Sequence, residues 1–306
     1  NISIPAGAIQ VVMGLSGSGK STLIRHINRL IDPTAGQIII EGQDVVGMTP
    51  ERLRDFRRHK TAMVFQKFGL LPHRTVIDNV GYGLEVQGVD HAARNKVAMR
   101  WIERVSLLGF ETKYPSQLSG GMQQRVGLAR ALANDAPILL MDEAYSALDP
   151  LIRYDMQTVL LDLQKEVRKT IVFITHDLDE AIRIGDRIAI MKDGVIIQEG
   201  TAEEIVMNPA DQYVADFVAG ISRLHLVKAH SVMMPVDQWR FQQPGVSLDS
   251  LPRCSPEADI DALIGKITGT GSDAIAIADG GAIVGVVTTR SLLLGVRGEP
   301  DARAAA

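Results

Sequence analysis

The sequence predicts an α/β protein built around a largely parallel sheet, with a second, smaller α/β domain after it. Apolar runs of strand length alternate with segments of helical spacing from Ile9 to Phe173, which is the order of a parallel sheet with crossover helices. A glycine-rich turn separates the first apolar run from the first helical segment. The pattern changes after Gly220. We therefore expect one domain over residues 1–220 and another over residues 221–306.

The glycine-rich turn predicts a phosphate-binding loop. It follows the apolar run Ile9–Met13, and the run Gly14–Thr22 fits the pattern G-x-x-x-x-G-K-[ST]. Its glycines allow the backbone to approach phosphate closely, and the N–H groups at the start of the next helix face the anion. An ordinary glycine-rich turn is the alternative, but the Lys-Ser pair stands at the required spacing. The expected nucleotide contacts here are Gly14, Ser16, Gly17, Ser18, Gly19, Lys20, Ser21 and Thr22.

Two later apolar runs end in residues that can serve such a site. Pro137–Met141 leads into the carboxylates Asp142 and Glu143, and Thr170–Thr175 leads into His176. Adjacent strand residues point to opposite faces, but a turn at the strand end can bring both carboxylates to one place. Solvated acids and a structural histidine are the simpler alternatives. The phosphate-binding loop upstream favours the catalytic interpretation.

A second glycine pair opens a predicted helix that reaches about Asn134. Ser119 precedes Gly120 and Gly121, and a serine in that position is a typical N-cap. The run Leu118–Gln124 resembles the signature loop of ATP-binding cassette (ABC) ATPases, and the motifs follow that family's order over residues 1 to about 220. The resemblance implies a P-loop ABC ATPase core with a helical subdomain at about residues 67–136.

The resemblance also implies residue roles. Lys20 and Ser21 would hold the phosphates and Mg2+, Asp142 would bind Mg2+ through water, and Glu143 would polarise the attacking water. Gln66 matches the Q-loop, Ser146–Asp149 the D-loop, and His176 the switch histidine. The implied catalytic residues are Glu143, His176, Gln66 and Lys20; the further nucleotide contacts are Gln66, Ser119, Gly120, Gly121 and Asp142; the metal ligands are Ser21, Gln66 and Asp142.

In this family the signature loop of one subunit closes over nucleotide held by the P-loop of another, so the resemblance implies a homodimer that uses ATP and Mg2+. ABC ATPases also stack adenine on an aromatic residue before the first strand seen here. No aromatic residue precedes Phe56, and we expect that contact to be replaced or to lie outside this chain.

The composition excludes several classes of protein. The 306 residues carry a formal net charge of −4, which argues against a nucleic-acid partner because such proteins need a basic face. No apolar run approaches the roughly 18 residues that span a bilayer, and Asn1–Gly7 has no signal-peptide pattern. The single cysteine, Cys254, excludes an internal disulfide and suits a reducing cytoplasm. We expect the basic run Arg52–Lys60 to be a solvated helix face.

The C-terminal domain has its own pattern. We expect a helix over Pro256–Ile267, strands over Asp273–Ala278 and Ala282–Thr288, and a short helix over Thr289–Gly295. This order resembles a single CBS module. A plain α/β dimerisation module is the alternative, because CBS modules normally work in pairs. A third interpretation makes this domain a ligand sensor that gates the ATPase.

The Q-loop region, residues 65–75, resembles that of the ATPase subunits of quaternary-amine importers, as do residues 127–135 and 149–153. That resemblance implies a peripheral subunit on the cytoplasmic face of the plasma membrane, bound to a membrane permease and acting indirectly with a substrate-binding protein. The osmolyte would be glycine betaine, proline betaine or choline.

Permease contact would fall near residues 67–85. The candidate apolar residues for this contact are Phe68, Leu70, Leu71 and Pro72. Packing within the helical subdomain itself is almost as good an explanation for an apolar residue at each of these positions. The rival class is a soluble ABC ATPase of DNA repair or translation. Such proteins usually carry a long coiled coil or two cassettes, whereas this sequence has one cassette and no heptad run.

Overall fold

The computed structural model describes residues 1–66, 69–146, 148–243 and 245–297. The chain divides into two compact units, Asn1–Glu199 and Gly200–Ala306, and each has a hydrophobic core of its own. The division falls at the end of a strand, about twenty residues before the domain boundary expected after Gly220. A functional boundary near Gly220 remains a prediction.

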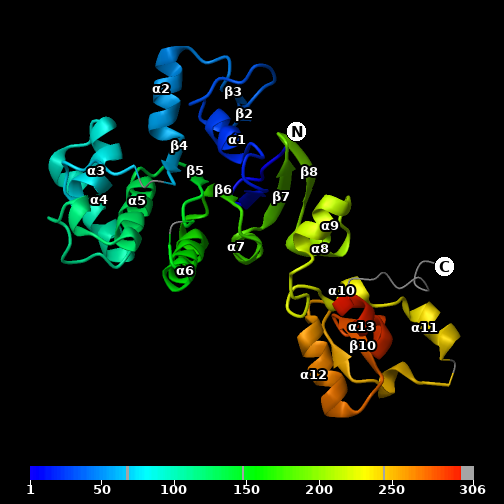
Figure 1. Cartoon of the computed structure of the whole chain (residues 1–306). Helices are drawn as coiled ribbons and strands as arrows, with labels where there is room; N and C mark the ends of the chain where they lie inside the picture. The colour runs from blue at the N-terminus through cyan, green and yellow to red at the C-terminus, as the bar shows by residue number, and fades with distance from the viewer. Residues whose placement is uncertain (67–68, 147, 244, 298–306) are drawn as a thin grey trace. The chain divides into compact units, whose positions relative to one another are not determined.

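The first unit is built on one six-stranded sheet (Figure 1). Five neighbouring strands pair in parallel, and the sixth returns through the two-residue turn Asp193-Gly194, whose residue types favour a tight hairpin turn. In spatial order the strands are β4 (Thr61–Val64), β5 (Ile138–Asp142), β6 (Thr170–Thr175), β1 (Ile9–Met13), β7 (Arg187–Lys192) and β8 (Val195–Gly200). All of β1 is buried, because a parallel strand is covered on both faces.

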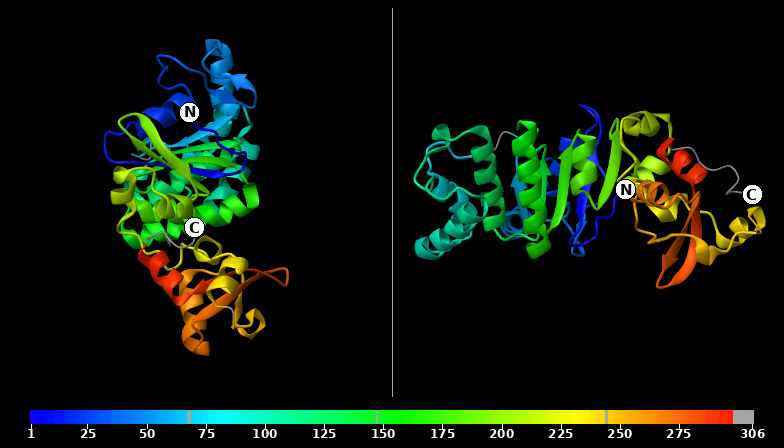
Figure 2. Two further views of the ribbon diagram at one scale, coloured as in Figure 1. Left: turned by 90° about the vertical axis from the view of Figure 1, so that its right-hand side faces the viewer. Right: turned by 90° about the horizontal axis from the view of Figure 1, so that it is seen from below.

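Helices cover both faces of this sheet. Helix α1 (Lys20–Ile27) packs Ile24 on the face that carries Val12 and Leu140. On the other face, Tyr145 lies 5.5 Å from Phe173, ring centre to ring centre. Figures 1 and 2 show strands between helical layers, with α1 on one side and helices α6 (Pro150–Val167) and α7 (Leu178–Ile184) on the other.

Between β4 and β5, which pair in the sheet, the chain forms a helical group. It comprises α3 (Val76–Val86), α4 (His91–Arg104), the 3-10 turn η1 (Pro115–Gln117) and α5 (Gly120–Ala133). The predicted helical subdomain is therefore confirmed. The sequence pattern predicts a helix over Ala92–Leu108. Helix α4 instead ends at Arg104, and Ser106 beyond it takes a left-handed backbone conformation with φ of 57°.

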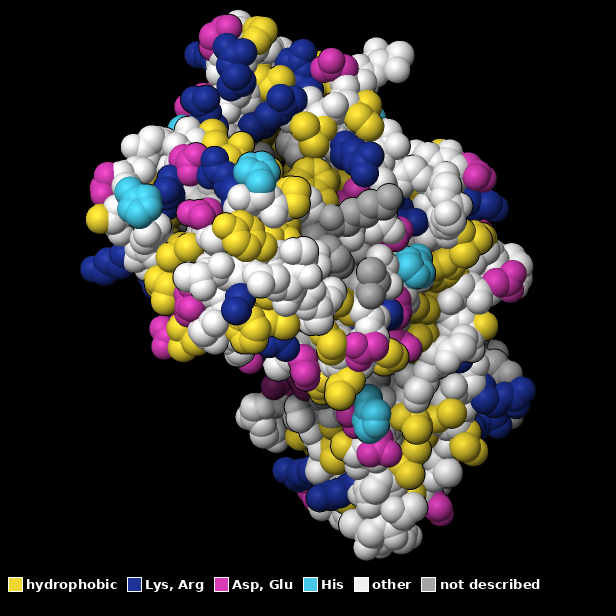
Figure 3. All heavy atoms as spheres, turned by 60° about the vertical axis from the view of Figure 1, so that its left-hand side comes forward, with side chains coloured by type: hydrophobic (Ala, Val, Ile, Leu, Met, Phe, Trp, Pro, Cys, Tyr) yellow, Lys and Arg dark blue, Asp and Glu magenta, His cyan; other side chains and the backbone are white. Residues whose placement is uncertain are grey.

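The predicted basic helix is α2 (Pro50–His59), which follows the short paired strands β2 (Ile39–Ile40) and β3 (Gln43–Asp44). Figure 3 shows basic side chains gathered at the top of the molecule, where α2 lies, with acidic side chains among them. Arg57 donates to the carbonyl oxygens of Asn28 and Arg29, and Arg54 pairs with Glu51. Part of the basic run thus fastens α2 to the end of α1.

The second unit contains a three-stranded sheet, in the order β11 (Ala282–Thr288), β10 (Ala274–Asp279), β9 (Arg253–Cys254). Its helices are α8 (Ala202–Met207), α9 (Gln212–Val218), α10 (Ala229–Val232), α11 (Val236–Gln242), α12 (Ile260–Thr270) and α13 (Thr289–Arg297), with a 3-10 turn η2 (Leu248–Ser250). The predicted order helix, strand, strand, helix is confirmed. Helix α12 begins at Ile260 rather than Pro256, because the Asp259 side chain caps it by accepting from the Ala262 N–H.

The region from Ser222 to Leu251 has few periodic signals in its sequence, yet much of it is structured. It contains α10, α11 and η2, and Trp239 is buried with Met234 against Val286 of β11. Met207 of α8 packs against the core of the same unit. No helix within the described residues is long and apolar enough to cross a bilayer.

Candidate nucleotide-binding site

The site lies where four parallel strands end. Strand register sets Met13 opposite Thr175, and Asp142 opposite Ile174, so the segments after β1, β5 and β6 leave the sheet at one edge. Gln66 follows β4, at the same edge. The carboxyl ends of parallel strands are where ligands bind in open α/β sheets. The fold therefore brings together four motifs that are far apart in the sequence.

The phosphate-binding loop depends on backbone that only glycine supplies. Gly14 has a φ of 154°, and a Cβ atom there would lie 2.1 Å from the carbonyl oxygen of Met191. Gly19 has a φ of 100° and immediately precedes α1. Ser18 is buried, whereas Ser16, Gly17 and Thr22 are exposed. The loop thus packs tightly on β7 at its start and stays open at its tip.

Lys20 is folded into this loop. Its residue is 4% exposed, and its Nζ donates to the carbonyl oxygens of Gly14 and Leu15 at 2.7 and 3.0 Å. Burial lowers the pKa of Lys20, while the nearby carboxylates of Glu143 and Asp142 oppose that shift. The loop therefore holds a buried ammonium group, solvated by backbone carbonyls, next to two acids.

Asp142 is held from two sides by one helix. Its Oδ1 accepts from Ser21 Oγ at 2.7 Å and its Oδ2 from the Arg25 guanidinium at 3.1 Å. Ser21 and Arg25 are four residues apart on α1, so they share a helix face. The Asp142 side chain is 3% exposed. Sequence reasoning missed Arg25, although its helical spacing from Ser21 was a usable signal.

Glu143 points into the same site because of its backbone. Its φ is 45°, a left-handed conformation that is uncommon outside glycine and that clusters at functional sites. Glu143 Oε2 accepts from Gln66 Nε2 at 3.0 Å and lies 3.8 Å from His176 Nδ1. The expected turn at the strand end therefore exists, and it places Glu143 between Gln66 and His176.

The predicted signature residues lie elsewhere. Ser119 is the N-cap of α5, where its Oγ accepts from the Met122 N–H. Ser119 and Gly120 are exposed, and Gly121 is buried against Ile152 of α6. Among the described residues, no hydrogen bond or ion pair joins these positions to the phosphate-binding loop. One chain thus assembles the loop, the carboxylates, Gln66 and His176, but leaves Ser119 and Gly120 exposed and unconnected to them.

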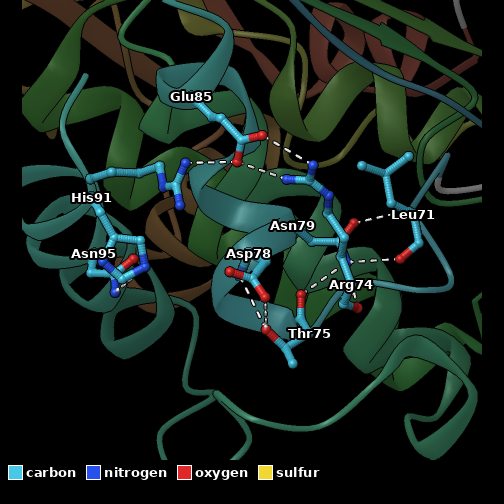
Figure 4. A network of polar contacts seen from close by, with 9 residues as sticks. Leu71, Arg74, Thr75, Asp78, Asn79, Glu85, His91 and Asn95 are labelled. Carbon is cyan, nitrogen blue, oxygen red and sulfur yellow. Dashed lines mark hydrogen bonds and ion pairs between the residues drawn. The ribbon is translucent and has the colours of Figure 1, made fainter. Parts of the chain in front are cut away.

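The segment before α3 is fastened by a polar network (Figure 4). Asn79, fully buried, accepts from the Leu71 N–H and donates to the carbonyl oxygens of Leu71, Arg74 and Thr75. Arg74 makes a two-pronged ion pair with Glu85, and these hydrogen bonds lower the pKa of Glu85. Of the predicted partner-contact residues, Leu70 and Leu71 are half-buried and Pro72 is exposed, while Phe68 lies outside the described residues.

The arrangement suits transfer of a phosphoryl group to water. A buried lysine and helix N–H groups can hold phosphate oxygens, and Ser21 and Asp142 present oxygen atoms of the kind that Mg2+ prefers. Glu143 offers a carboxylate that can orient and deprotonate water.

Comparisons with known proteins agree with this chemistry. A family model described as ABC transporter matches residues 1–146. The chain is 59% identical over 243 residues to the glycine betaine transport ATP-binding protein OpuAA of Bacillus subtilis (strain 168), covering 79% of this chain and 58% of that protein. It is 45% identical over 293 residues to the trimethylamine N-oxide transport system ATP-binding protein TmoW of Ruegeria pomeroyi, covering 96% of this chain and 83% of that one.

A solved structure resembles the first unit. The dimeric post-hydrolysis structure of the ATP-binding cassette MJ0796, bound to ADP and Pi, superposes with a TM-score of 0.62 at 37% identity, over 66% of this chain and 88% of that chain. The predicted P-loop α/β fold with its helical subdomain is thus confirmed. The chain belongs to the ATP-binding proteins of the ABC transporter family.

Proposed function

We propose that this chain is an ATP-hydrolysing subunit that powers import of a quaternary-amine osmolyte through a separate membrane permease. The observation that carries the enzymatic part is the convergence of Glu143, Gln66 and His176 beside the Ser21–Asp142 pair. OpuAA supports the transport part through the glycine betaine in its name. We place the chain on the cytoplasmic face of the plasma membrane, as a peripheral subunit.

The proposed reaction is hydrolysis of ATP to ADP and phosphate. Lys20 binds the terminal phosphates, and the N–H groups at the start of α1 face them. Glu143 accepts a proton from water as the water oxygen attacks the γ-phosphorus. The bond between the γ-phosphorus and the β–γ bridging oxygen breaks, and ADP leaves with that oxygen. His176 and Gln66 orient the γ-phosphate and the water. Ser21 and Asp142, with Gln66, would hold Mg2+, which supplies positive charge to the phosphate oxygens.

We propose that two copies of the chain complete each site. Ser119, Gly120 and Gly121 would reach the nucleotide held by the partner copy. Two features support this arrangement: the outward position of Ser119 on α5, and the dimeric form of the related cassette structure. Closure of the dimer would then complete the site for hydrolysis.

The second unit is proposed to be a CBS-like regulatory module. Its helix, strand, strand, helix order and its separate core support this proposal. ATPase activity, measured over a range of salt concentrations with the full chain and with a chain ending at Gly220, tests it. Identical salt responses would remove the regulatory role.

Trimethylamine N-oxide joins the candidate substrates. TmoW matches more of this chain than OpuAA does, and its name refers to trimethylamine N-oxide. Glycine betaine and trimethylamine N-oxide share a trimethylated nitrogen. Uptake of each labelled compound by vesicles holding this chain and the permease that copurifies with it separates the two candidates.

Glu143→Gln tests the enzymatic proposal. The variant keeps the shape of the side chain and its contact with Gln66 but loses the proton acceptor, so turnover should fall by about 10²-fold or more while ATP binding persists. Hydrolysis at the wild-type rate would contradict the assignment of Glu143.

A further inference from the structure

One arginine joins two loops of the site. Arg153, on the first turn of α6, donates to Asp177 Oδ2 at 2.7 Å and to the carbonyl oxygen of Leu148 at 3.2 Å. Leu148 belongs to the segment between Glu143 and α6, and Asp177 is the residue directly after His176. The side chains of Arg153 and Asp177 are 25% and 31% exposed, so water screens this pair only in part.

The two carboxylate oxygens of Asp177 accept hydrogen bonds from different elements. Its Oδ1 accepts from the Glu180 N–H and caps α7, while its Oδ2 binds Arg153. The Asp177 N–H donates to Thr175 Oγ1 at 3.0 Å. His176 is therefore flanked on both sides by anchored residues, and the anchor on the α7 side leads through Arg153 to the carbonyl of Leu148.

A neighbouring arginine provides an internal comparison. Arg183, on α7, donates to the Tyr154 carbonyl oxygen, to Gln157 Oε1 and to Thr158 Oγ1, all on α6. It thus links the same two helices as Arg153 does. These hydrogen bonds reach neither the segment before α6 nor the loop of His176 and Asp177.

We propose that Arg153 is a positioning residue that couples the backbone at Leu148 to the loop of His176 and Asp177, and so fixes His176 beside Glu143. This inference rests on the proposed ATPase function. A guanidinium can bind both acceptors at once because its donors have a fixed fork geometry. Displacement of one loop then moves the other, since the same planar group holds both.

The kinetic test uses Arg153→Met and Asp177→Asn. Asn keeps the N-cap of α7 but removes the charge that Arg153 binds. Each variant should lower kcat about tenfold with KM for ATP changed less than twofold, since misplacing a catalytic group costs rate rather than substrate binding. The double variant should be no slower than the single ones, because both remove one interaction. Arg153→Lys should restore part of kcat by reaching one acceptor.

The matched control is Arg183→Met, which should lower the melting temperature but leave kcat within twofold. Wild-type kcat in Arg153→Met, multiplied losses in the double variant, or an equal loss in Arg183→Met would overturn the proposal. The last result would reduce Arg153 to a helix-packing residue.

A second readout does not depend on hydrolysis. Amide hydrogen exchange in full-length Arg153→Met should quicken both at residues 148–149 and at residues 176–178, whereas Arg183→Met should quicken it only further along α7. If wild-type chain proves to have no ATPase activity, the proposed function fails, yet this exchange pattern still supports or refutes the coupling. Faster exchange at only one of the two loops would refute it.

Discussion

At the scale of single residues, the site depends on two residues whose conformation or burial costs free energy. Glu143 adopts a left-handed backbone with φ of 45°, and without it two successive strand residues would point to opposite faces. Lys20 is buried, and that burial lowers its pKa against the pull of two carboxylates. Strain and desolvation of this kind persist only where the surrounding structure enforces them. The loop packed on β7 keeps Lys20 buried, and the end of β5 holds Glu143 in its left-handed conformation.

Glu180 predicts a pH dependence of stability. Burial is the main cause that raises its pKa, although Gln157 and Thr175 donate to it. A carboxyl whose folded pKa exceeds its unfolded value destabilises the fold as pH rises through that interval, and the cost persists above it. Glu180→Gln should therefore raise the melting temperature at about pH 8 more than at about pH 5.

Melting curves at a series of pH values measure this effect. Glu103→Gln, at an exposed position on α4, is the control for the change in formal charge and should give a similar small shift at every pH. A Glu180→Gln shift that does not vary with pH would contradict the burial argument.

At the scale of elements, polar side chains fix the segment between β4 and α3. Asn79 supplies three donated hydrogen bonds and one accepted one to residues 71–75 (Figure 4). Backbone groups bond only part of this segment, through Arg74 N–H to the Leu71 carbonyl oxygen and Asn79 N–H to the Thr75 carbonyl oxygen. The buried amide supplies partners for the Leu71 N–H and the Arg74 carbonyl oxygen. The position of this segment, close to Gln66 in sequence, thus depends on a side chain of α3.

Asn79→Ala should destabilise the protein by about 2–3 kcal/mol, because it leaves buried backbone groups without partners. Amide exchange at Leu71 should quicken most. The control is Asn95→Ala on α4. Asn95 is half-buried, its amide nitrogen only approaches His91 Nε2 at 3.5 Å, and the free energy of unfolding of this variant should change little. Equal losses in the two variants, by urea unfolding, would show that the network does not act as described.

Several elements could be predicted from sequence because local signals set them. Strands β1 and β5 coincide with apolar runs of the sequence. Helices α5 and α6 begin directly after the capping residues Ser119 and Asp149. In contrast, α10 and α11 have four and seven residues, too short for periodicity to appear. They depend on tertiary contacts, such as the exchange of backbone hydrogen bonds between Met234 and Val286.

The residues of the site likewise fall into those that the sequence predicts and those that depend on tertiary contacts. The glycine-rich motif predicted Lys20, and the resemblance to ABC ATPases implied Asp142, Glu143, Gln66 and His176. The strand register brings these residues to one edge. Arg25 and Arg153 were not predicted, since their roles arise from which helix face meets which loop. The φ of Glu143 was not predictable either, because glutamate has no intrinsic preference for it.

At the scale of the whole molecule, two cores predict two partly independent unfolding events. Ile277 is fully buried in the second unit. Ile277→Ala should lower the stability of that unit by about 2–5 kcal/mol, while ADP should raise only the transition of the first unit, which holds the site. Scanning calorimetry with and without ADP measures both. A single transition that both changes shift equally would contradict the separation into units.

The central claim is that each ATP site is completed by a second copy of this chain, and mixing two inactive variants tests it most directly. Lys20→Ala removes the phosphate contact, and Ser119→Arg blocks the signature position. Random pairing of equal amounts gives half mixed dimers with one intact site of two, so about a quarter of wild-type ATPase activity should appear. If the mixture stays as inactive as either variant alone, Ser119 does not serve the partner's nucleotide and the shared site is wrong.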